Sequence, residues 1–171
     1  RAGESRDPQR RGPGCDALTG ATELVLELVR PQAELYDEWS EAHREWGPGT
    51  HEDGFAIGEN DVDTERGFRA WVDRLLSDPG DLWWVVEDGR VLGGVTFRSL
   101  DDERVSRLGH VSYGIRPSAR GRGVATWALG EMLDYGAKLG VDPVLAVCRD
   151  DNAGSIATLE DMKVLYSGFD L

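Results

Sequence analysis

Several features that would define a function at once are scarce or absent in this 171-residue sequence. It has no apolar run near the roughly 20 residues that a membrane-spanning helix needs, which excludes a transmembrane protein. The two cysteines, Cys15 and Cys148, lie far apart and in no metal or redox spacing, as expected of a protein from a reducing cytoplasm. The three histidines form no HExxH or clustered pattern, so the sequence predicts no metal site.

Basic residues are also scarce. Lys and Arg number 19 against 32 Asp and Glu, which gives a formal net charge of -13. An acidic surface repels a phosphate backbone, so general nucleic-acid binding is excluded along with membrane binding. The composition is otherwise that of a globular protein, with 40% hydrophobic and 30% charged residues. We therefore expect a cytoplasmic protein with a small-molecule or protein substrate, and a homodimer is left open.

The length predicts a single domain with a sizeable core. Residues 1–22 are rich in Arg, Gly and Pro and show no periodicity, which predicts a disordered tail followed by a domain over residues 23–171. These first residues also lack the apolar segment of a secretory signal peptide. The start at Arg1 leaves open that residues precede it.

Periodicity and turn residues predict alternating strands and helices. Strands are expected over 23–29, 82–87, 90–98, 108–116 and 143–148, and helices from Pro31 to Gly47 and over 64–77, 121–139 and 152–162. The turn Asp88-Gly89 between two β-rich runs predicts a hairpin. At most one short strand fits after residue 163. The order implies a mixed sheet with helices on its faces, an α/β (α+β) fold.

One segment is basic, in contrast to the acidic chain as a whole. From Arg104 to Gly130 there is no Asp or Glu, and the segment contains a strand, a turn at Pro117 and the glycine-rich start of a helix. Unpaired N–H groups at a helix N-terminus favour an anion. Gly121 and Gly123 have no Cβ to keep phosphate oxygens away from the backbone. The segment therefore predicts a pyrophosphate site.

Two common nucleotide motifs do not fit this site. A P-loop ends in Gly-Lys-Ser/Thr, whereas this sequence continues Gly123-Val-Ala125. A dinucleotide-binding GxGxxG motif has a third glycine, where this sequence has Thr126, and an acidic residue after the next strand, where it has Cys148.

The pattern that does fit is R-x-x-G-x-A, formed by Arg120-Gly-Arg-Gly-Val-Ala125. In this motif the sequence resembles the GNAT superfamily of acetyl-CoA-dependent N-acetyltransferases. Residues 109–118, GHVSYGIRPS, and residues 145–152, LAVCRDDN, followed by Ser155, resemble the strands on either side of the family's cofactor cleft. The residues in these segments are similar to those of a bacterial branch of predicted acetyltransferases. The resemblance covers about residues 24–160.

The resemblance implies a mostly antiparallel sheet with a splay between two parallel strands, those predicted at 108–116 and 143–148. It implies acetyl-CoA as co-substrate and an amine acceptor, with direct attack of the amine on the thioester in a ternary complex. A backbone amide near the thioester would stabilise the oxyanion. The cofactor-binding residues that it implies are Tyr113, Ile115, Arg116, Arg120, Gly121, Arg122, Gly123, Val124, Ala125 and Asn152.

The amine must lose a proton, and the sequence offers several groups for the proton transfers. His110 is the first candidate for the base, with a packed histidine as the equal alternative. Ser155 or water would return a proton to the thiolate. Glu52, Asp53 and Glu59, in a predicted acidic loop, are the candidate substrate-binding residues, since their charge attracts a cationic amine.

The sequence departs from the family pattern near its end. Leu159 stands where many members have a tyrosine acid, Lys163 stands where a glycine is usual, and the family's last strands are missing or short. Two alternatives to an active enzyme therefore remain: a catalytically degenerate acyl-CoA-binding domain and a binder of sugar or nucleotide phosphates.

Overall fold

The structure is a computed structural model that describes residues 25–49, 51–77 and 81–169. The predicted tail and Cys15 lie outside the described residues. The strands are β1 (Leu26–Val29), β2 (Asp81–Glu87), β3 (Arg90–Phe97), β4 (Val111–Ile115), β5 (Leu145–Arg149) and β6 (Leu165–Phe169). The α-helices are α1 (Tyr36–Arg44), α2 (Glu65–Ser77), α3 (Val105–Leu108), α4 (Val124–Lys138) and α5 (Ala153–Asp161), and the 3-10 helices are η1 (Ala33–Leu35) and η2 (Pro117–Ala119).

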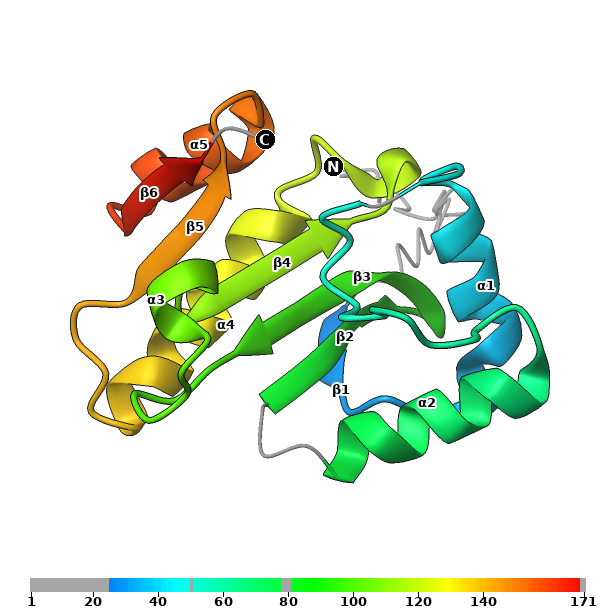
Figure 1. The fold of residues 1–171 in the computed structure, drawn as a ribbon. Coiled ribbons are helices and arrows are strands. Elements are labelled where there is room, and N and C mark those ends of the chain that lie inside the picture. The colour runs from blue at the N-terminus through cyan, green and yellow to red at the C-terminus, as the bar shows by residue number, and fades with distance from the viewer. Residues whose placement is uncertain (1–24, 50, 78–80, 170–171) are drawn as a thin grey trace, which may run out of the picture.

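The strands form one sheet in chain order, β1-β2-β3-β4-β5-β6. The pairs from β1 to β4 are antiparallel, and β4–β5 and β5–β6 are parallel. This is the predicted mixed, mostly antiparallel sheet. Figure 1 shows β4 and β5 close together at their starts and diverging toward their ends. The two strands pair at a single position, Val111 with Ala146, so the sheet is split beyond it.

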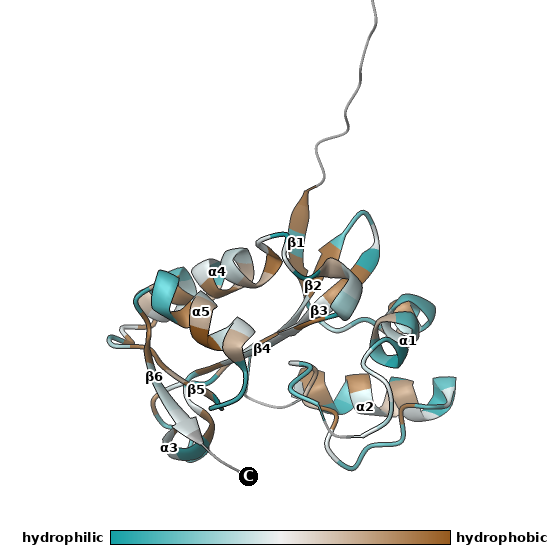
Figure 2. Ribbon diagram, turned by 90° about the horizontal axis from the view of Figure 1, so that it is seen from above, coloured by the Kyte–Doolittle hydropathy of each residue, from teal (hydrophilic) through white to brown (hydrophobic). Residues whose placement is uncertain are grey.

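Helices cover both faces of the sheet. Figure 2 shows α4 and α5 on one side and α1 and α2 on the other. The helix α4 buries Leu129 and Met132 against an aliphatic core, whereas α1 and α2 bury an aromatic core. The members of the aromatic core that are at most 1% exposed include Trp39, Phe55, Phe68, Trp71 and Trp84. Burial of such large rings is the main stabilisation of the α1–α2 face.

Local sequence explains several elements. The hairpin β2–β3 turns at Asp88 and Gly89, which have φ of 49° and 79°, as a two-residue turn requires. Thr64 caps α2, because its Oγ1 accepts the N–H of Gly67 at 3.1 Å. The helix α4 begins three residues later than predicted, because Gly121 and Gly123 both have positive φ. The short helix α3 was not predicted; it replaces the expected start of the strand at residue 108.

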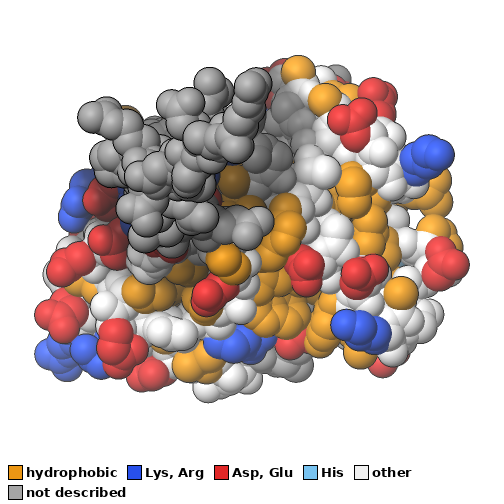
Figure 3. Space-filling model, turned by 180° about the vertical axis from the view of Figure 1, so that it is seen from behind, with side chains coloured by type: hydrophobic (Ala, Val, Ile, Leu, Met, Phe, Trp, Pro, Cys, Tyr) orange, Lys and Arg blue, Asp and Glu red, His pale blue; other side chains and the backbone are white. Residues whose placement is uncertain are grey.

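The one short strand expected after residue 163 is β6. It pairs with β5 in parallel over all five of its residues, from Leu165 to Phe169. Among the described residues no helix is long and apolar enough to cross a membrane. Figure 3 shows a face on which acidic side chains are more frequent than basic ones, in keeping with the net charge of the chain.

Candidate active site

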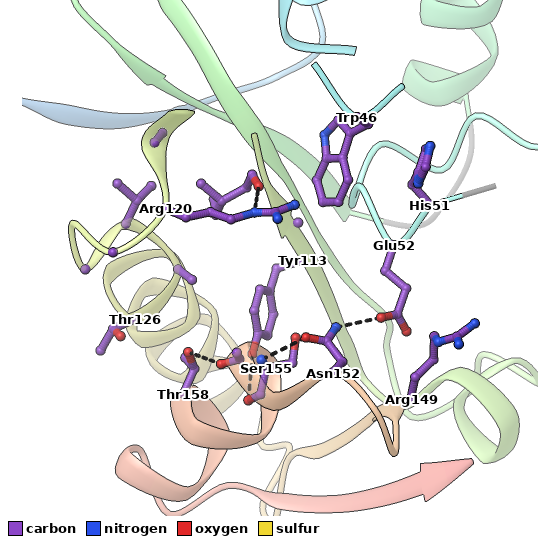
Figure 4. A pocket seen from close by; sticks show the side chains of 18 of the residues that line it. Trp46, His51, Glu52, Tyr113, Arg120, Thr126, Arg149, Asn152, Ser155 and Thr158 are labelled. Carbon is purple, nitrogen blue, oxygen red and sulfur yellow. Dashed lines mark hydrogen bonds between the residues drawn. The ribbon is translucent and has the colours of Figure 1, made fainter. Parts of the chain in front are cut away.

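A cavity of about 1010 Å³ opens where β4 and β5 diverge. We call it the larger cavity; Figure 4 shows its side chains. It is lined by Trp46, His51, Glu52, Tyr113, Gly114, Ile115, Ala119, Arg120, Gly121, Gly123, Val124, Ala125, Thr126, Arg149, Asp151, Asn152, Gly154, Ser155 and Thr158. Most of the cofactor-binding residues expected from the sequence therefore line the larger cavity.

Residues 120–125, which we call the glycine loop, form one wall. Gly121 and Gly123 have φ of 72° and 78°, a conformation that side chains rarely adopt, and a Cβ on either would point into open space. Gly123 is the N-cap of α4 and has no side chain to accept the first amides of the helix. Those N–H groups have no intrahelical partner, so the loop offers an anion several donors and the positive end of the helix dipole.

Arg120 is presented to the larger cavity by two contacts. Its Nε donates to the carbonyl oxygen of Ile115 at 2.9 Å, and its guanidinium lies 4.5 Å from the ring centroid of Trp46. Stacking on an aromatic face restrains the cation without neutralising its charge. Figure 4 shows Arg120 and Trp46 side by side above Tyr113. Trp46, at the end of α1, therefore supports the cationic part of this wall.

The other two predicted arginines have different roles. Arg116 is fully buried, and its guanidinium binds Glu41 of α1, Glu45 at the C-cap of that helix and the carbonyl oxygen of Val91. The hydrogen bond from Arg116 lowers the pKa of Glu45 to about 2. Arg122 is paired with Glu87 at 2.7 Å. Neither side chain lines the larger cavity, because each is held by carboxylates elsewhere.

The carboxylate network also fixes the glycine loop to α1. Glu45 accepts hydrogen bonds from the N–H of Ser118 at 3.1 Å and from its hydroxyl at 3.0 Å. Ser118 belongs to η2, which leads directly into the loop. The buried Arg116 and Glu45 therefore hold the end of α1, and with it Trp46, against the start of the loop.

The segment 51–55 forms the opposite wall and rests on the sheet through glycines. A Cβ on Gly54 would overlap the carbonyl oxygen of Gly94, and one on Gly114 would overlap the backbone of Glu52 and Asp53. The segment thus lies in direct backbone contact with β3 and β4, which only glycine permits. Asp53 adds a turn, since its Oδ1 accepts the N–H of Phe55 at 2.9 Å. Glu52 is thereby placed beside the split in the sheet.

The start of α5 forms the floor between the two walls. Asn152 caps this helix by accepting the N–H of Ser155 at 3.1 Å, and its Nδ2 donates to Oε2 of Glu52 at 2.7 Å. Tyr113 reaches across from β4, and its hydroxyl donates to the carbonyl oxygen of Ser155 at 3.4 Å. Burial raises the pKa of Tyr113, so its hydroxyl stays protonated.

A second cavity of about 250 Å³ adjoins the first at the point where the strands part. It is lined by Glu52, Gly54, Leu108, Val111, Ser112, Tyr113, Ala146, Val147, Cys148, Ser155 and Leu159. Glu52, Tyr113 and Ser155 line both cavities. Burial raises the pKa of the Cys148 thiol, which argues against a nucleophilic cysteine.

His110 does not line either cavity. It is 6% exposed, and its Nδ1 accepts the N–H of Leu145 at 2.9 Å, so the ring joins the starts of β4 and β5. Burial lowers its pKa, which keeps the ring neutral. The structure thus gives the ring a packing function, the alternative that the sequence left open, and His110 as the base stays a prediction without support from this geometry.

Two of the predicted substrate-binding residues are also outside both cavities. Asp53 is 8% exposed and turned into the protein near His43, and burial raises its pKa. Glu59 is exposed and lines neither cavity. Glu52 is the one of the three that the structure brings to the site. Among the described residues no group of three or more His, Cys, Asp or Glu could hold a metal ion.

Some lining residues were not predicted from the sequence. His51 lies 5.7 Å from Trp46 between ring centroids, and Arg149 is paired with Asp151 at 2.7 Å. Thr126 and Thr158 lie on α4 and α5, the helices beside the split between β4 and β5. Trp46 was the only one with a signal: its place beside Gly47-Pro48 suggested the acceptor pocket, whereas the structure stacks it against Arg120. The others had none, because their place depends on the splay of the sheet.

Residues 23–163 match a family model described as an acetyltransferase (GNAT) domain. The chain belongs to the GNAT acetyltransferase family. This membership confirms the predicted family and the prediction of an acetyl-CoA-dependent acyltransferase. No curated protein matches the sequence.

Solved structures show the same fold at low sequence identity. An N-acetyltransferase from Staphylococcus aureus has 17% identity and a TM-score of 0.55, covering 81% of this chain and 82% of the other. A GNAT acetyltransferase from Streptococcus pneumoniae has 12% identity and a TM-score of 0.53, with coverage of 81% and 83%. The microcin C7 self-immunity acetyltransferase MccE, solved with acetyl-CoA and AMP, has 15% identity, a TM-score of 0.51 and coverage of 79% and 76%. At these identities the likeness concerns the fold.

Proposed function

We propose that this GNAT domain transfers the acetyl group of acetyl-CoA directly to a primary amine, with both substrates bound together. The observation that carries the proposal is the open N-terminus of α4, whose glycine-rich amides face a cavity that continues into the split between β4 and β5. A long, flexible thioester with a diphosphate at one end fits such a path.

The residues present fit coenzyme A at each part of this path. The amides of the glycine loop and the guanidinium of Arg120 would hold the diphosphate, since no carboxylate among the described residues neutralises them. The pantetheine arm would lie between β4 and the start of α5, where Tyr113 and Asn152 line the cavity. The thioester would then be at the junction of the two cavities, next to Glu52.

The chemistry requires three events at that junction. The amine nitrogen forms a bond to the carbonyl carbon while the carbon–sulfur bond breaks, and a β4 amide near the carbonyl stabilises the negative charge. The nitrogen loses a proton to the carboxylate of Glu52 or to water beside it. The thiolate takes a proton from water or from Ser155, which fits the absence of a tyrosine at Leu159.

A second candidate is binding of acyl-CoA without transfer. It is favoured by His110, which lines neither cavity, and by Leu159, a buried aliphatic residue that lines the second cavity. Release of free CoA thiol in the presence of amines separates the two functions. Stabilisation by CoA without any thiol release would support the second.

The cofactor site is tested by the variant Gly123→Asp. This change places a side chain and a negative charge where the diphosphate would bind, so we expect at least a tenfold loss of CoA affinity, measured by thermal shift and calorimetry. Gly140→Asp is the matched control, because Gly140 also has positive φ and open space around it but lies beyond the other end of α4. Unchanged CoA affinity in Gly123→Asp would refute the site.

A further inference from the structure

The second cavity is where an acceptor can meet the thioester. It extends from α5, which contributes Leu159, through the gap between β4 and β5 to Gly54 and Leu108. Figure 2 shows α5 on one side of the sheet and α3, which ends at Leu108, on the other. A molecule in this cavity therefore approaches the junction from the face opposite to α4 and α5, without crossing the cofactor path.

The lining of the second cavity is mostly apolar, with Glu52, Ser112, Tyr113 and Ser155 as its polar members. Its walls are largely Leu108, Val111, Ala146, Val147 and Leu159. Glu52 is the only charged side chain that lines it among the described residues, and it lines the larger cavity as well. Its volume of about 250 Å³ is below the roughly 300–1,000 Å³ of sites for drug-sized ligands, so it suits a slender group.

Glu52 is held in a defined position. Its Oε2 accepts the hydrogen bond from Asn152 at 2.7 Å, and its backbone rests on Gly114. Among the described residues no hydrogen bond or ion pair occupies its Oε1. One oxygen is thus fixed to α5 and the other is available to a donor at the junction. An ammonium group makes a charge-assisted hydrogen bond to such a carboxylate, about twice as strong as one between neutral groups.

We propose that the second cavity is the acceptor site, and that it takes a primary amine on an unbranched alkyl stem while rejecting amines that carry a carboxylate. The proposal rests on the proposed function. Glu52 binds the ammonium and accepts one of its protons, which passes to water before the neutral amine attacks, and the stem lies along the aliphatic wall. A carboxylate on the stem would be left unpaired in an apolar space, near Glu52 and on an acidic protein. A free alkylamine and a lysine side chain share this chemistry.

Arg120 and Arg149 are the described arginines that line the larger cavity, and the proposed function assigns Arg120 to the diphosphate, so Arg149 is the arginine left for a carboxylate-bearing acceptor. It lines the larger cavity but not the second one. Its guanidinium makes a two-pronged pair with Asp151, with Nε to Oδ1 at 2.8 Å and an Nη to Oδ2 at 2.7 Å. Because this pair uses the face that would recognise a carboxylate, Arg149 does not reverse the preference set by Glu52.

The test compares acceptors that differ only at the far end. CoA release from acetyl-CoA is measured with pentylamine and 5-aminopentanoate, and a further arm uses Nα-acetyl-lysine amide to show whether a lysine side chain is accepted. We expect pentylamine to exceed 5-aminopentanoate at least tenfold in kcat/KM. Glu52→Gln, which keeps an oxygen for Asn152, should lower kcat/KM for pentylamine at least tenfold and leave CoA affinity within twofold. Glu103→Gln, an exposed acid outside both cavities, is the control.

Each outcome decides a different question. Equal or faster turnover of 5-aminopentanoate, or an unchanged kcat/KM in Glu52→Gln, refutes the acceptor site and leaves the proposed transfer intact. Binding of CoA without release of the thiol from acetyl-CoA in the presence of any of the three amines refutes the transfer itself and the acceptor site with it. Turnover of pentylamine alone assigns the site to free alkylamines, and turnover of the lysine derivative as well extends it to lysine side chains.

Discussion

The glycine loop takes its shape from its own sequence, whereas the opposite wall of the larger cavity depends on contacts between distant segments. In the loop, two positive-φ glycines and an uncapped helix start are enough to present the amides. On the other wall, Glu52 is placed by Gly54 and Gly114, which let the 51–55 segment lie on β3 and β4. In the proposed function, the local motif would hold the diphosphate of the cofactor, and the packed loop would hold the acceptor.

This difference means that the two walls can be damaged separately. Substitutions in the glycine loop, such as Gly123→Asp, should weaken CoA binding with little effect on the core. Substitutions beneath the 51–55 segment should displace Glu52 and expose part of the aromatic core, since Phe55 belongs to both the segment and that core. The following predictions use this contrast, in order of decreasing effect.

The largest effect is expected for Gly54→Ala. The new Cβ would overlap the backbone of Gly94, and φ is +75°, so we expect a loss of about 3 kcal/mol in the free energy of unfolding. Gly58→Ala is the control in the same loop, with φ of +59° but only Asn60 near its Cβ, and should lose about 1 kcal/mol. Urea unfolding measures both. Equal losses would show that the contact with the sheet does not hold the segment.

An intermediate, pH-dependent effect is expected for Glu45→Gln. The hydrogen bond from Arg116 lowers the pKa of Glu45 to about 2, against about 4.3 in an unfolded chain. A lowered pKa contributes stability that is present above the unfolded value and is lost as the pH falls toward 2. At pH 7 the melting temperature of the variant should therefore be lower than that of the wild-type protein. The difference between the two melting temperatures should narrow between about pH 5 and pH 2.

Glu131→Gln, at an exposed position on α4, serves as the control for that measurement. Its melting temperature should match that of the wild-type protein at every pH between 7 and 2. A difference between wild type and Glu45→Gln that stays constant down to pH 2 would contradict the assigned role of the ion pair between α1 and Arg116.

The smallest effect is expected for Trp46→Leu. It removes the ring beneath Arg120, and a cation–π contact at a partly exposed site contributes about 0.5–1 kcal/mol. CoA affinity should fall two- to fivefold by calorimetry, with little change in stability. Trp46→Tyr retains an aromatic face and should recover most of the loss. An affinity as low in Trp46→Tyr as in Trp46→Leu would contradict stacking as the cause.

The contrast between local motifs and distant contacts also explains which features could be predicted from the sequence. The hairpin turn at Asp88-Gly89, the start of a helix at Thr64 and the glycine loop are set by a few neighbouring residues, and each was predicted. The burial of Arg116 was not, because its partners Glu45 and Glu41 lie 71 and 75 residues away. The sequence assigned Arg116 to the cofactor; the structure pairs its side chain with these carboxylates, and a cofactor contact through its backbone stays a prediction.

The acceptor side shows the same limit. Glu52, Asp53 and Glu59 form one acidic stretch in the sequence, and nothing in it distinguishes the residue that faces the site from the two that do not. The distinction arises from the glycine contacts of the segment, which turn Asp53 inward and Glu52 toward α5. Such contacts are invisible until β3, β4 and the loop are placed together.

The glycine contact beneath the 51–55 segment has a consequence for directed evolution of new acceptor preferences. Because Gly54, Gly94 and Gly114 touch through their main chains, none of them can vary alone without forcing the others apart. Libraries should therefore leave this trio unchanged and randomise positions 51 and 52, together with Leu108 across the second cavity. The glycine contacts then keep the 51–55 segment in place while the side chains that line the cavities are changed.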